Sequence, residues 1–300
     1  MISQIDASNF NKAKDVLVQY GREIRKDKSE EDTLNEYKKL ISDPNYKLFF
    51  YEDNNSNQGI SLVNIKRNQL QNIYFKDSNI DNQVERDFFA YVFNFTKKQG
   101  NRFMSQFEAF SNNLKEYMKD LGISTIIRHE MLVDRSKIIK LKPKSLSERY
   151  RFAVWDDSYI QKCAELEYSA FKDSIDFKLG GINSVSAIKK YYHDFVNNKI
   201  GILQRGIEFM LFEDDEIIGY CIMSDLHGYG FILTMAIVPD KSGQGLGTSL
   251  LIHAMQDLMA KTDKSKVGLT VTEENANAFH LYKKLGFEVS KSQASYMLVG

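Results

Sequence analysis

One segment of the chain, Phe231 to Ala260, constrains the fold more than any other. It opens with an apolar run, FILTMAIV, whose β-branched residues indicate a strand buried on both faces. Pro239 and Asp240 end that run, and a glycine-rich turn, SGQGLGT, follows. The residues after the turn place apolar side chains on one face, which predicts an amphipathic helix. A strand, a tight turn and a helix in this order are typical of an α/β fold.

The glycine-rich turn has the composition of an anion site. Gly243, Gly245 and Gly247 allow positive φ angles and a close backbone approach, and the first amides of a helix lack intrahelical acceptors. Such amides can hold a pyrophosphate. A Walker loop is excluded because Thr248-Ser249 stands where Lys-Ser/Thr is needed, and a dinucleotide fingerprint is excluded because Gly247 comes one residue early. A turn without any ligand is the remaining alternative.

A second motif follows in the next strand and helix. The run VGLTV, from Val267 to Val271, predicts a strand. The pattern from Asn275 to Phe287 then predicts a short helix with an Asn start and a stop at Gly286.

Together, Met235 to Phe287 resembles the acetyl-CoA-binding half of the GNAT acyltransferase superfamily. The resemblance implies acetyl-CoA as co-substrate, no metal, backbone contacts from the strand to pantetheine, and a loop that holds the pyrophosphate. Ser242 departs from the family, which prefers Gln or Arg at that position, so cofactor affinity is expected to be modified. The resemblance makes Tyr282 the general acid that protonates the leaving thiolate. It implies cofactor contacts from Met235, Ala236, Ile237, Gly243, Gln244, Gly245, Leu246, Gly247, Thr248 and Asn275.

The chain is long enough for two domains, and its two halves share a pattern. A cationic, proline-containing stretch at 137–147 predicts a connector. We expect an α/β (α+β mixed sheet) fold of two tandem GNAT-like domains, 1–145 and 148–300. No glycine occurs between Asn72 and Phe95, so the first domain is interpreted as degenerate and non-catalytic, although Tyr117 matches Tyr282 in this interpretation. An unrelated α/β domain is the alternative.

The expected second domain opens with a strand and an amphipathic helix. Tyr150 to Trp155 predicts the strand, and Asp156 to Ser158 offers a helix cap. Aromatic residues and two glycines between Phe171 and Arg205 are candidates for an acceptor pocket or for ordinary helix packing. The expected helix has a roughly helical spacing of Ile160, Cys163, Ala164, Leu166, Glu167 and Phe171.

The general base is the weakest part of this interpretation. Some family members carry a Glu five residues before the motif's Asn, but Thr270 stands there, and Thr234 is the other polar residue where an acid was expected. Asp225 and His227 are the remaining base candidates, and His has a suitable intrinsic pKa. Glu273 is better placed to favour the helix N-terminus electrostatically. A chain of water molecules is an equal alternative.

The amino-acid composition limits the classes of partner that we expect for this protein. Lys plus Arg and Asp plus Glu both number 40, so the chain lacks the basic excess of a nucleic-acid binder. No apolar run reaches the roughly 18 residues that span a bilayer, and two cysteines suit a reducing cytoplasm. The sequence therefore predicts a cytoplasmic N-acetyltransferase acting on a small-molecule or peptide amine. A non-catalytic acyl-CoA-binding or sensing protein and an interaction scaffold are the alternatives.

Overall fold

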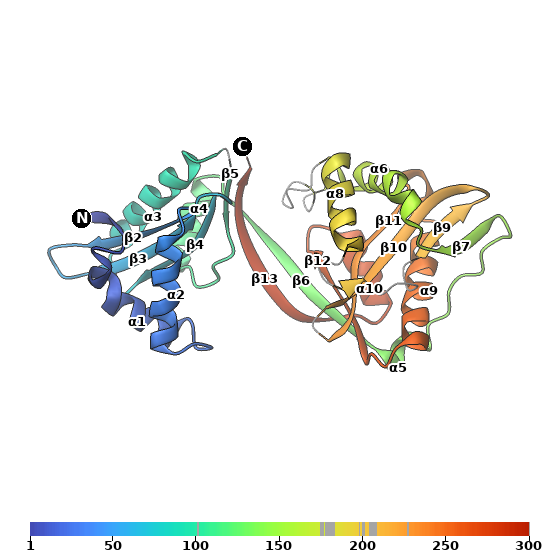
Figure 1. The fold of residues 1–300 in the computed structure, drawn as a ribbon, viewed down its shortest axis with the longest axis horizontal. Coiled ribbons are helices and arrows are strands. Elements are labelled where there is room, and N and C mark those ends of the chain that lie inside the picture. Colours follow the sequence, from blue (N-terminus) through green and yellow to red (C-terminus); the bar gives the residue numbers. More distant parts are fainter. Residues whose placement is uncertain are drawn as a thin grey trace. The chain divides into compact units, whose positions relative to one another are not determined.

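The chain folds into two compact units of mixed α/β structure (Figure 1). The computed structural model describes residues 1–100, 102–174, 177, 184–197, 199, 202–203, 209–226 and 228–299. Unit 1 comprises Met1–Ile127 with Gln293–Gly300, and unit 2 comprises Arg128–Ser292. In the described part of the chain, no helix is long and apolar enough to cross a membrane. The arrangement confirms the expected mixed α/β class.

Unit 1 is built on a sheet in the order β1-β2-β3-β4-β5-β13. Its first strands pair antiparallel, β4 pairs parallel with β5, and the last residues of β13 pair antiparallel with β5. The elements are β1 (Ile2–Ile5), η1 (Phe10–Ala13), α1 (Lys14–Glu23), α2 (Glu30–Ser42), β2 (Tyr46–Glu52), β3 (Gln58–Asn64), β4 (Gln69–Phe75), α3 (Asn82–Lys97), β5 (Arg102–Ser105), α4 (Asn112–Asp120) and β6 (Ser124–Asp134).

Unit 2 repeats this plan, with a sheet in the order β6-β12-β11-β10-β9-β7. Apart from α5, β8 and η3, its described elements follow one another as they do in unit 1, which supports the predicted internal repeat. They are α5 (Arg135–Ile138), β7 (Tyr150–Val154), η2 (Asp157–Tyr159), α6 (Ile160–Phe171), α8 (Val185–Val196), β8 (Ile202–Leu203), β9 (Phe209–Glu213), β10 (Glu216–Leu226), β11 (Tyr229–Ile237), η3 (Pro239–Lys241), α9 (Leu246–Lys261), β12 (Lys266–Thr272), α10 (Ala276–Lys284) and β13 (Glu288–Val299).

Two long strands, β6 and β13, contribute residues to both units. The later part of β6 pairs with β12 in unit 2, with Val133 opposite Val267. The end of β13 pairs with β5 in unit 1, with Tyr296 opposite Ser105. The compact units therefore differ from the expected domains, 1–145 and 148–300, at both ends. That expected division stays a prediction about which segments fold independently.

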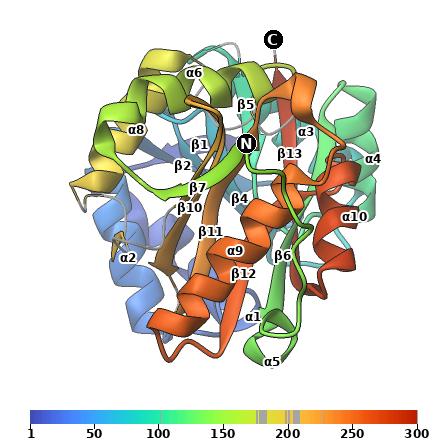
Figure 2. The ribbon, with the colours of Figure 1, turned by 90° about the vertical axis from the view of Figure 1, so that its right-hand side faces the viewer.

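Helices cover both faces of the sheet in unit 2. Helices α6 and α8 pack against each other on one face, and α9 lies against β9, β10 and β11 on the other (Figure 2). Successive side chains of β9 point to opposite faces of the sheet, because side chains alternate along a strand. Met210 packs with α6 and α8, whereas Leu211 packs with α9. The sheet is thus the middle layer of unit 2.

We expect Tyr296→Ala to destabilise unit 1 by about 3–5 kcal/mol, which is the usual cost of deleting a large buried aromatic ring. Tyr296 is 4% exposed and its ring meets the Phe110 ring edge-on at 5.0 Å. Urea unfolding of the full chain measures the loss, and Val289→Ala, on the exposed start of the same strand, is the control. An unchanged midpoint for Tyr296→Ala would contradict the assignment of the C-terminal residues to the core of unit 1.

Candidate functional site

The turn before α9 has the backbone shape that its glycines predict. Gly243 and Gly245 have φ angles of 77° and 85°, in the left-handed region that L side chains rarely adopt. Gly245 is the N-cap of α9, and no side chain caps the helix there. The amides of the first helical turn are therefore available to an anion, and the positive end of the helix dipole favours one.

The start of α9 lies against the end of β11. A Cβ atom built on Gly247 would lie 3.3 Å from Ile237 Cγ1 and 3.8 Å from Met235 Cε. A side chain at this position would press against Ile237, which would have to shift by a few tenths of an ångström. The structure thus brings together Met235, Ile237 and Gly247, which the sequence had assigned to one site, while Leu246 is buried beneath the turn.

Strands β11 and β12 separate as they approach this turn. Their parallel ladder covers Gly230↔Val267 and Phe231↔Gly268, whereas β11 continues to Ile237 and β12 to Thr272. The backbone edge of β11 that faces β12 can therefore accept an extended ligand as an added strand. The expected burial of β11 on both faces is wrong in part, because Met235 and Ile237 are only half-buried beside this gap.

The second motif lies on α10, which contacts β12. Asn275 is the N-cap of this helix, and its Oδ1 accepts a hydrogen bond from the Ala278 amide at 3.4 Å. Tyr282 is half-buried, and its ring centroid lies 5.7 Å from that of Phe287. Tyr282 packs against the same apolar cluster as Met235 and Ile237.

Comparison with known proteins identifies this arrangement. Residues 183–287 match the family model described as the acetyltransferase (GNAT) family. Residues 183–287 belong to that family. We call them the GNAT segment.

Two curated relatives and one solved structure extend the comparison. The mycothiol acetyltransferase of Kineococcus radiotolerans is 30% identical over 82 residues, which cover 27% of this chain and 26% of that protein. The [ribosomal protein bS18]-alanine N-acetyltransferase of Escherichia coli K12 is 29% identical over 93 residues, 31% of this chain and 62% of that protein. The chain thus spans about a quarter of the first and less than two thirds of the second.

The solved structure shows the fold of the whole chain. A GCN5-related N-acetyltransferase from Sphaerobacter thermophilus matches 99% of this chain and 95% of its own, at 14% identity and a TM-score of 0.59. The match therefore includes unit 1 as well as the unit that carries the GNAT segment.

A lysine from the expected connector lies over the glycine turn of the GNAT segment. Lys144 Nζ donates to the Gln244 carbonyl at 3.3 Å, and its Cδ lies 3.5 Å from a Cβ built on Gly245. The stretch is fastened along α9, because Gln256 Nε2 donates to the carbonyls of Ile138 and Leu141. The residues at 137–147 therefore place a positive charge at the proposed anion site, which the sequence interpretation missed.

The two base candidates from the sequence stay predictions. Asp225 lies opposite Gly230, about seven residues and roughly 23 Å along β11 from Ile237. Its carboxylate forms an ion pair of 2.6 Å with Lys264. His227 lies outside the described residues.

A carboxylate that the sequence interpretation did not select lies closer to the Met235–Ile237 end of β11. Glu167 of α6 accepts hydroxyl hydrogen bonds at Oε2 from Tyr192 of α8 and Tyr220 of β10. The hydroxyl of Thr234 donates to the same oxygen at 3.2 Å. Glu167 belongs to the inward-facing spacing of its helix, and a carboxylate in such a position was the signal that could have identified it.

Burial holds the two tyrosines of this cluster in their neutral form. Desolvation, the main cause, and the negative charge of Glu167 raise the pKa of the Tyr192 hydroxyl well above its usual value. The pKa of Tyr220 is raised in the same way, with the largest contribution again from burial. Both phenols therefore act as hydrogen-bond donors to the carboxylate over the ordinary pH range.

The region expected to line the acceptor pocket is described only in part. Gly180, Gly181 and Arg205 lie outside the described residues. Tyr192 is fully buried in the α6–α8 core, and Phe171 and Tyr191 pack against that core.

Unit 1 has a different helix start where the GNAT segment has its glycine turn. Asp81 is the N-cap of α3, and its Oδ1 accepts from the amides of Gln83 at 2.8 Å and Val84 at 3.4 Å. The aspartate thus occupies the amides that an anion would need and adds a negative charge.

The tyrosine motif is also absent from unit 1. The Phe287 amide after Gly286 donates to the Tyr282 carbonyl, and the Ile123 amide after Gly122 donates in the same way to the Met118 carbonyl. Met118 therefore corresponds to Tyr282, and the expected match of Tyr117 was wrong by one residue. A buried methionine has no proton to donate.

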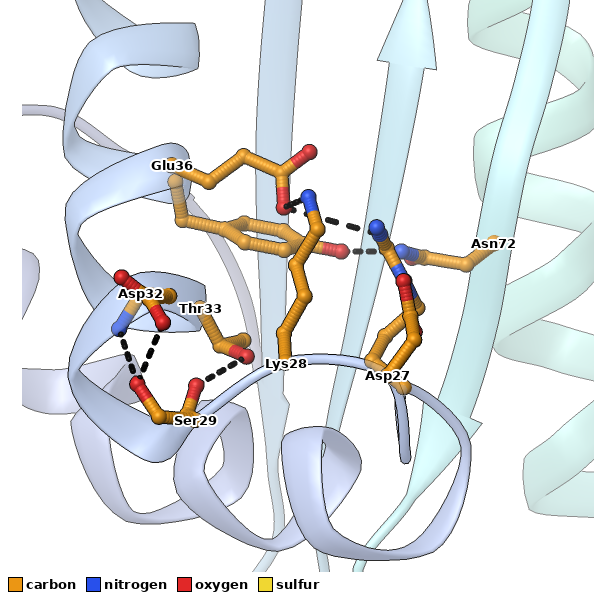
Figure 3. A network of polar contacts seen from close by, with 9 residues as sticks. Asp27, Lys28, Ser29, Asp32, Thr33, Glu36 and Asn72 are labelled. Atoms are coloured by element: carbon orange, nitrogen blue, oxygen red, sulfur yellow. Dashed lines mark hydrogen bonds and ion pairs between the residues drawn. The ribbon is translucent and has the colours of Figure 1, made fainter.

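In unit 1 the polar contact beside the matching strand position joins two uncharged side chains, Asn72 and Tyr37. Asn72 on β4 and Thr234 on β11 hold the same position in their units. Asn72 pairs with Leu62 next to the bulge between β3 and β4, and Thr234 pairs with Ile222 next to the bulge between β10 and β11. Asn72 Nδ2 donates to the buried Tyr37 hydroxyl of α2 (Figure 3). Its Oδ1 accepts from the Leu62 amide.

Proposed function

We propose that unit 2 binds acetyl-CoA and transfers its acetyl group to an amine. The observation that carries the proposal is the uncapped, glycine-led start of α9 beside the separated strands β11 and β12. The family of the GNAT segment supports it. The relatives' names include an acetyltransferase of mycothiol and one of a protein alanine, which supports a small-molecule or peptide amine as acceptor.

In this proposal, different residues of unit 2 bind different parts of acetyl-CoA. The amides that follow Gly245 hold the pyrophosphate, and Lys144 adds positive charge in place of the side chain that Ser242 lacks. The free edge of β11 at Met235, Ala236 and Ile237 pairs with the pantetheine arm. Unit 1 binds no second molecule, because Asp81 already occupies the amides of α3.

Transfer requires that a neutral amine attacks the thioester carbonyl carbon while the C–S bond breaks. The leaving thiolate takes a proton, and Tyr282 is the proposed donor. The alternative of a non-catalytic sensor rested on Thr234 and Thr270 standing where carboxylates were expected. Glu167, whose Oε2 lies 3.2 Å from Thr234 Oγ1, places a carboxylate there and favours the enzyme.

Calorimetric titration of acetyl-CoA into the full chain tests the binding site. We expect one molecule per chain for the wild type and no measurable binding for Gly245→Val, because a β-branched residue cannot keep φ at 85° without strain and fills the space before the amides. Gly228→Val is the matched control, since Gly228 has a φ of 81° and open surroundings in a different turn of unit 2. Unchanged affinity in folded Gly245→Val, or two molecules per wild-type chain, would contradict the proposal.

Replacement of Lys144 tests the charge over the turn. We expect Lys144→Ala to weaken acetyl-CoA binding by about 1 kcal/mol, or about fivefold in Kd, because the lysine is exposed and its attraction to phosphate is screened. The difference should shrink as salt is added. Lys142→Ala, an exposed lysine of the same stretch, should leave Kd unchanged. Equal losses in both variants would show a general charge effect.

Removal of the Tyr282 hydroxyl tests the acid. Tyr282→Phe keeps the ring against Phe287, so acetyl-CoA affinity should hold while kcat falls on the order of 10²- to 10⁴-fold. Single-turnover transfer to an alanine-led peptide avoids masking by slow product release. Tyr168→Phe on α6 is the control. A single-turnover rate equal to that of the wild type would mean that another group protonates the thiolate.

A further inference from the structure

The Glu167 cluster joins three hydroxyls to one carboxylate inside unit 2. It draws one residue from each of α6, α8, β10 and β11. The rings of Tyr192 and Tyr220 are fully buried and both meet the Trp155 ring at 5.9 Å. Four elements and a buried aromatic contact therefore fix the position of the carboxylate more firmly than a surface glutamate would be fixed.

The cluster has one contact more than it has protons. Besides the three hydroxyl contacts with Glu167, the Tyr192 and Tyr220 hydroxyl oxygens lie 2.5 Å from each other. With Glu167 ionised, the three hydroxyls supply three protons for four contacts, since each hydroxyl donates once. One proton added to the carboxylate lets all four contacts become hydrogen bonds. The contacts of the cluster therefore outnumber the protons that its three hydroxyls supply.

The groups that face Glu167 leave the carboxylate as the proton acceptor. The titratable neighbours from its own and the adjoining elements are Cys163, Tyr191, Tyr192 and Tyr220. Burial, the largest cause in each case, and the charge of Glu167 raise the pKa of all three tyrosines and of the Cys163 thiol. These neighbours stay neutral at ordinary pH, so they do not compete for the proton.

The carboxylate also lies next to the proposed path of the thioester. Thr234, which donates to Glu167 Oε2, directly precedes the strand residues Met235 to Ile237 on β11. All three hydroxyls reach Oε2, so Oε1 is not engaged by any of them. Glu167 as a residue is half-buried, not fully enclosed.

We propose that Glu167 is the general base of unit 2 and that its carboxylate binds the acceptor as an ammonium ion and removes one proton from it. The proposal rests on the acetyltransferase function proposed above. The neutral amine then forms the N–C bond as the C–S bond breaks, and the thiolate takes the proton of Tyr282. The second nitrogen-bound proton passes through solvent to the Tyr282 phenolate, and Glu167 releases its proton to solvent, which restores both groups. The substrate class is a primary amine that is cationic at neutral pH.

Two peptides serve as probes, one led by a free alanine and one with a blocked N-terminus and a single lysine. Acetyl transfer to each is measured from pH 6 to 10 by thiol release, and binding of each probe by calorimetry. In Glu167→Gln we expect kcat to fall about 100-fold or more at pH 7 for a probe that the wild type uses. The deficit should shrink roughly tenfold per pH unit as the amine, with a pKa of about 8 or 10.4, loses its proton in solution.

Two further variants separate a base from a structural role. Glu165→Gln, two positions along on the exposed face of α6, should keep the wild-type rate and profile. Tyr220→Phe removes one donor from Glu167 and keeps the ring, so kcat should fall by less than in Glu167→Gln while acetyl-CoA affinity holds. A merely structural Glu167 would give a loss that does not vary with pH, together with a lowered unfolding midpoint.

The outcomes also distinguish this inference from the proposed function. If wild-type chain fails to bind acetyl-CoA, the proposed function fails first. If acetyl-CoA binds and acetyl transfer proceeds, but Glu167→Gln has the wild-type pH profile or a pH-independent loss, the assignment of Glu167 is overturned alone. Wild-type chain that binds acetyl-CoA but neither binds nor acetylates either probe would also overturn it.

Discussion

The close approach of α9 to the end of β11 is the constraint on which the candidate site depends. Gly247 has no Cβ, so the first turn of the helix rests on Met235 and Ile237, and Gly245 reaches the positive φ that starts the helix without a side-chain cap. The uncapped helix start thus lies beside the end of β11, where the ladder with β12 has already ended. In the function proposed above, these backbone groups bind the anion and the extended chain attached to it, and Lys144 supplies the charge that Ser242 does not.

The two units share an order of strands and helices, but differ in the few side chains that decide whether the helix start is open to an anion. In both units two parallel strands pair over only two residues, β4 with β5 in unit 1 and β11 with β12 in unit 2. Both units also have a β-bulge at the same position, between β3 and β4 and between β10 and β11. In unit 1 the helix start is closed by the carboxylate of Asp81, and the polar group at the bulge is a neutral amide. In unit 2 the helix start is open and Glu167 supplies charge. Electrostatics, more than backbone shape, separates the two.

Much of the local structure could be predicted, because each element carries its own pattern. The strand, glycine turn and helix from Phe231 onward and the Asn275 cap of α10 are found where the sequence placed them. Partners distant in sequence were missed. Lys144 lies in a stretch expected to be a connector, and its place over the turn depends on hydrogen bonds from Gln256 to carbonyls more than 100 residues earlier.

The sequence by itself determined the elements, their repeated order and the glycine-led helix start, since propensity, periodicity and positive φ are local properties. Tertiary structure alone decided that the end of β13 completes unit 1 and that Glu167 meets Thr234. Both depend on strand pairing or packing between distant segments. An inward carboxylate on a helix has no visible partner in the sequence, because its partners come from three other elements brought together only by the folded sheet.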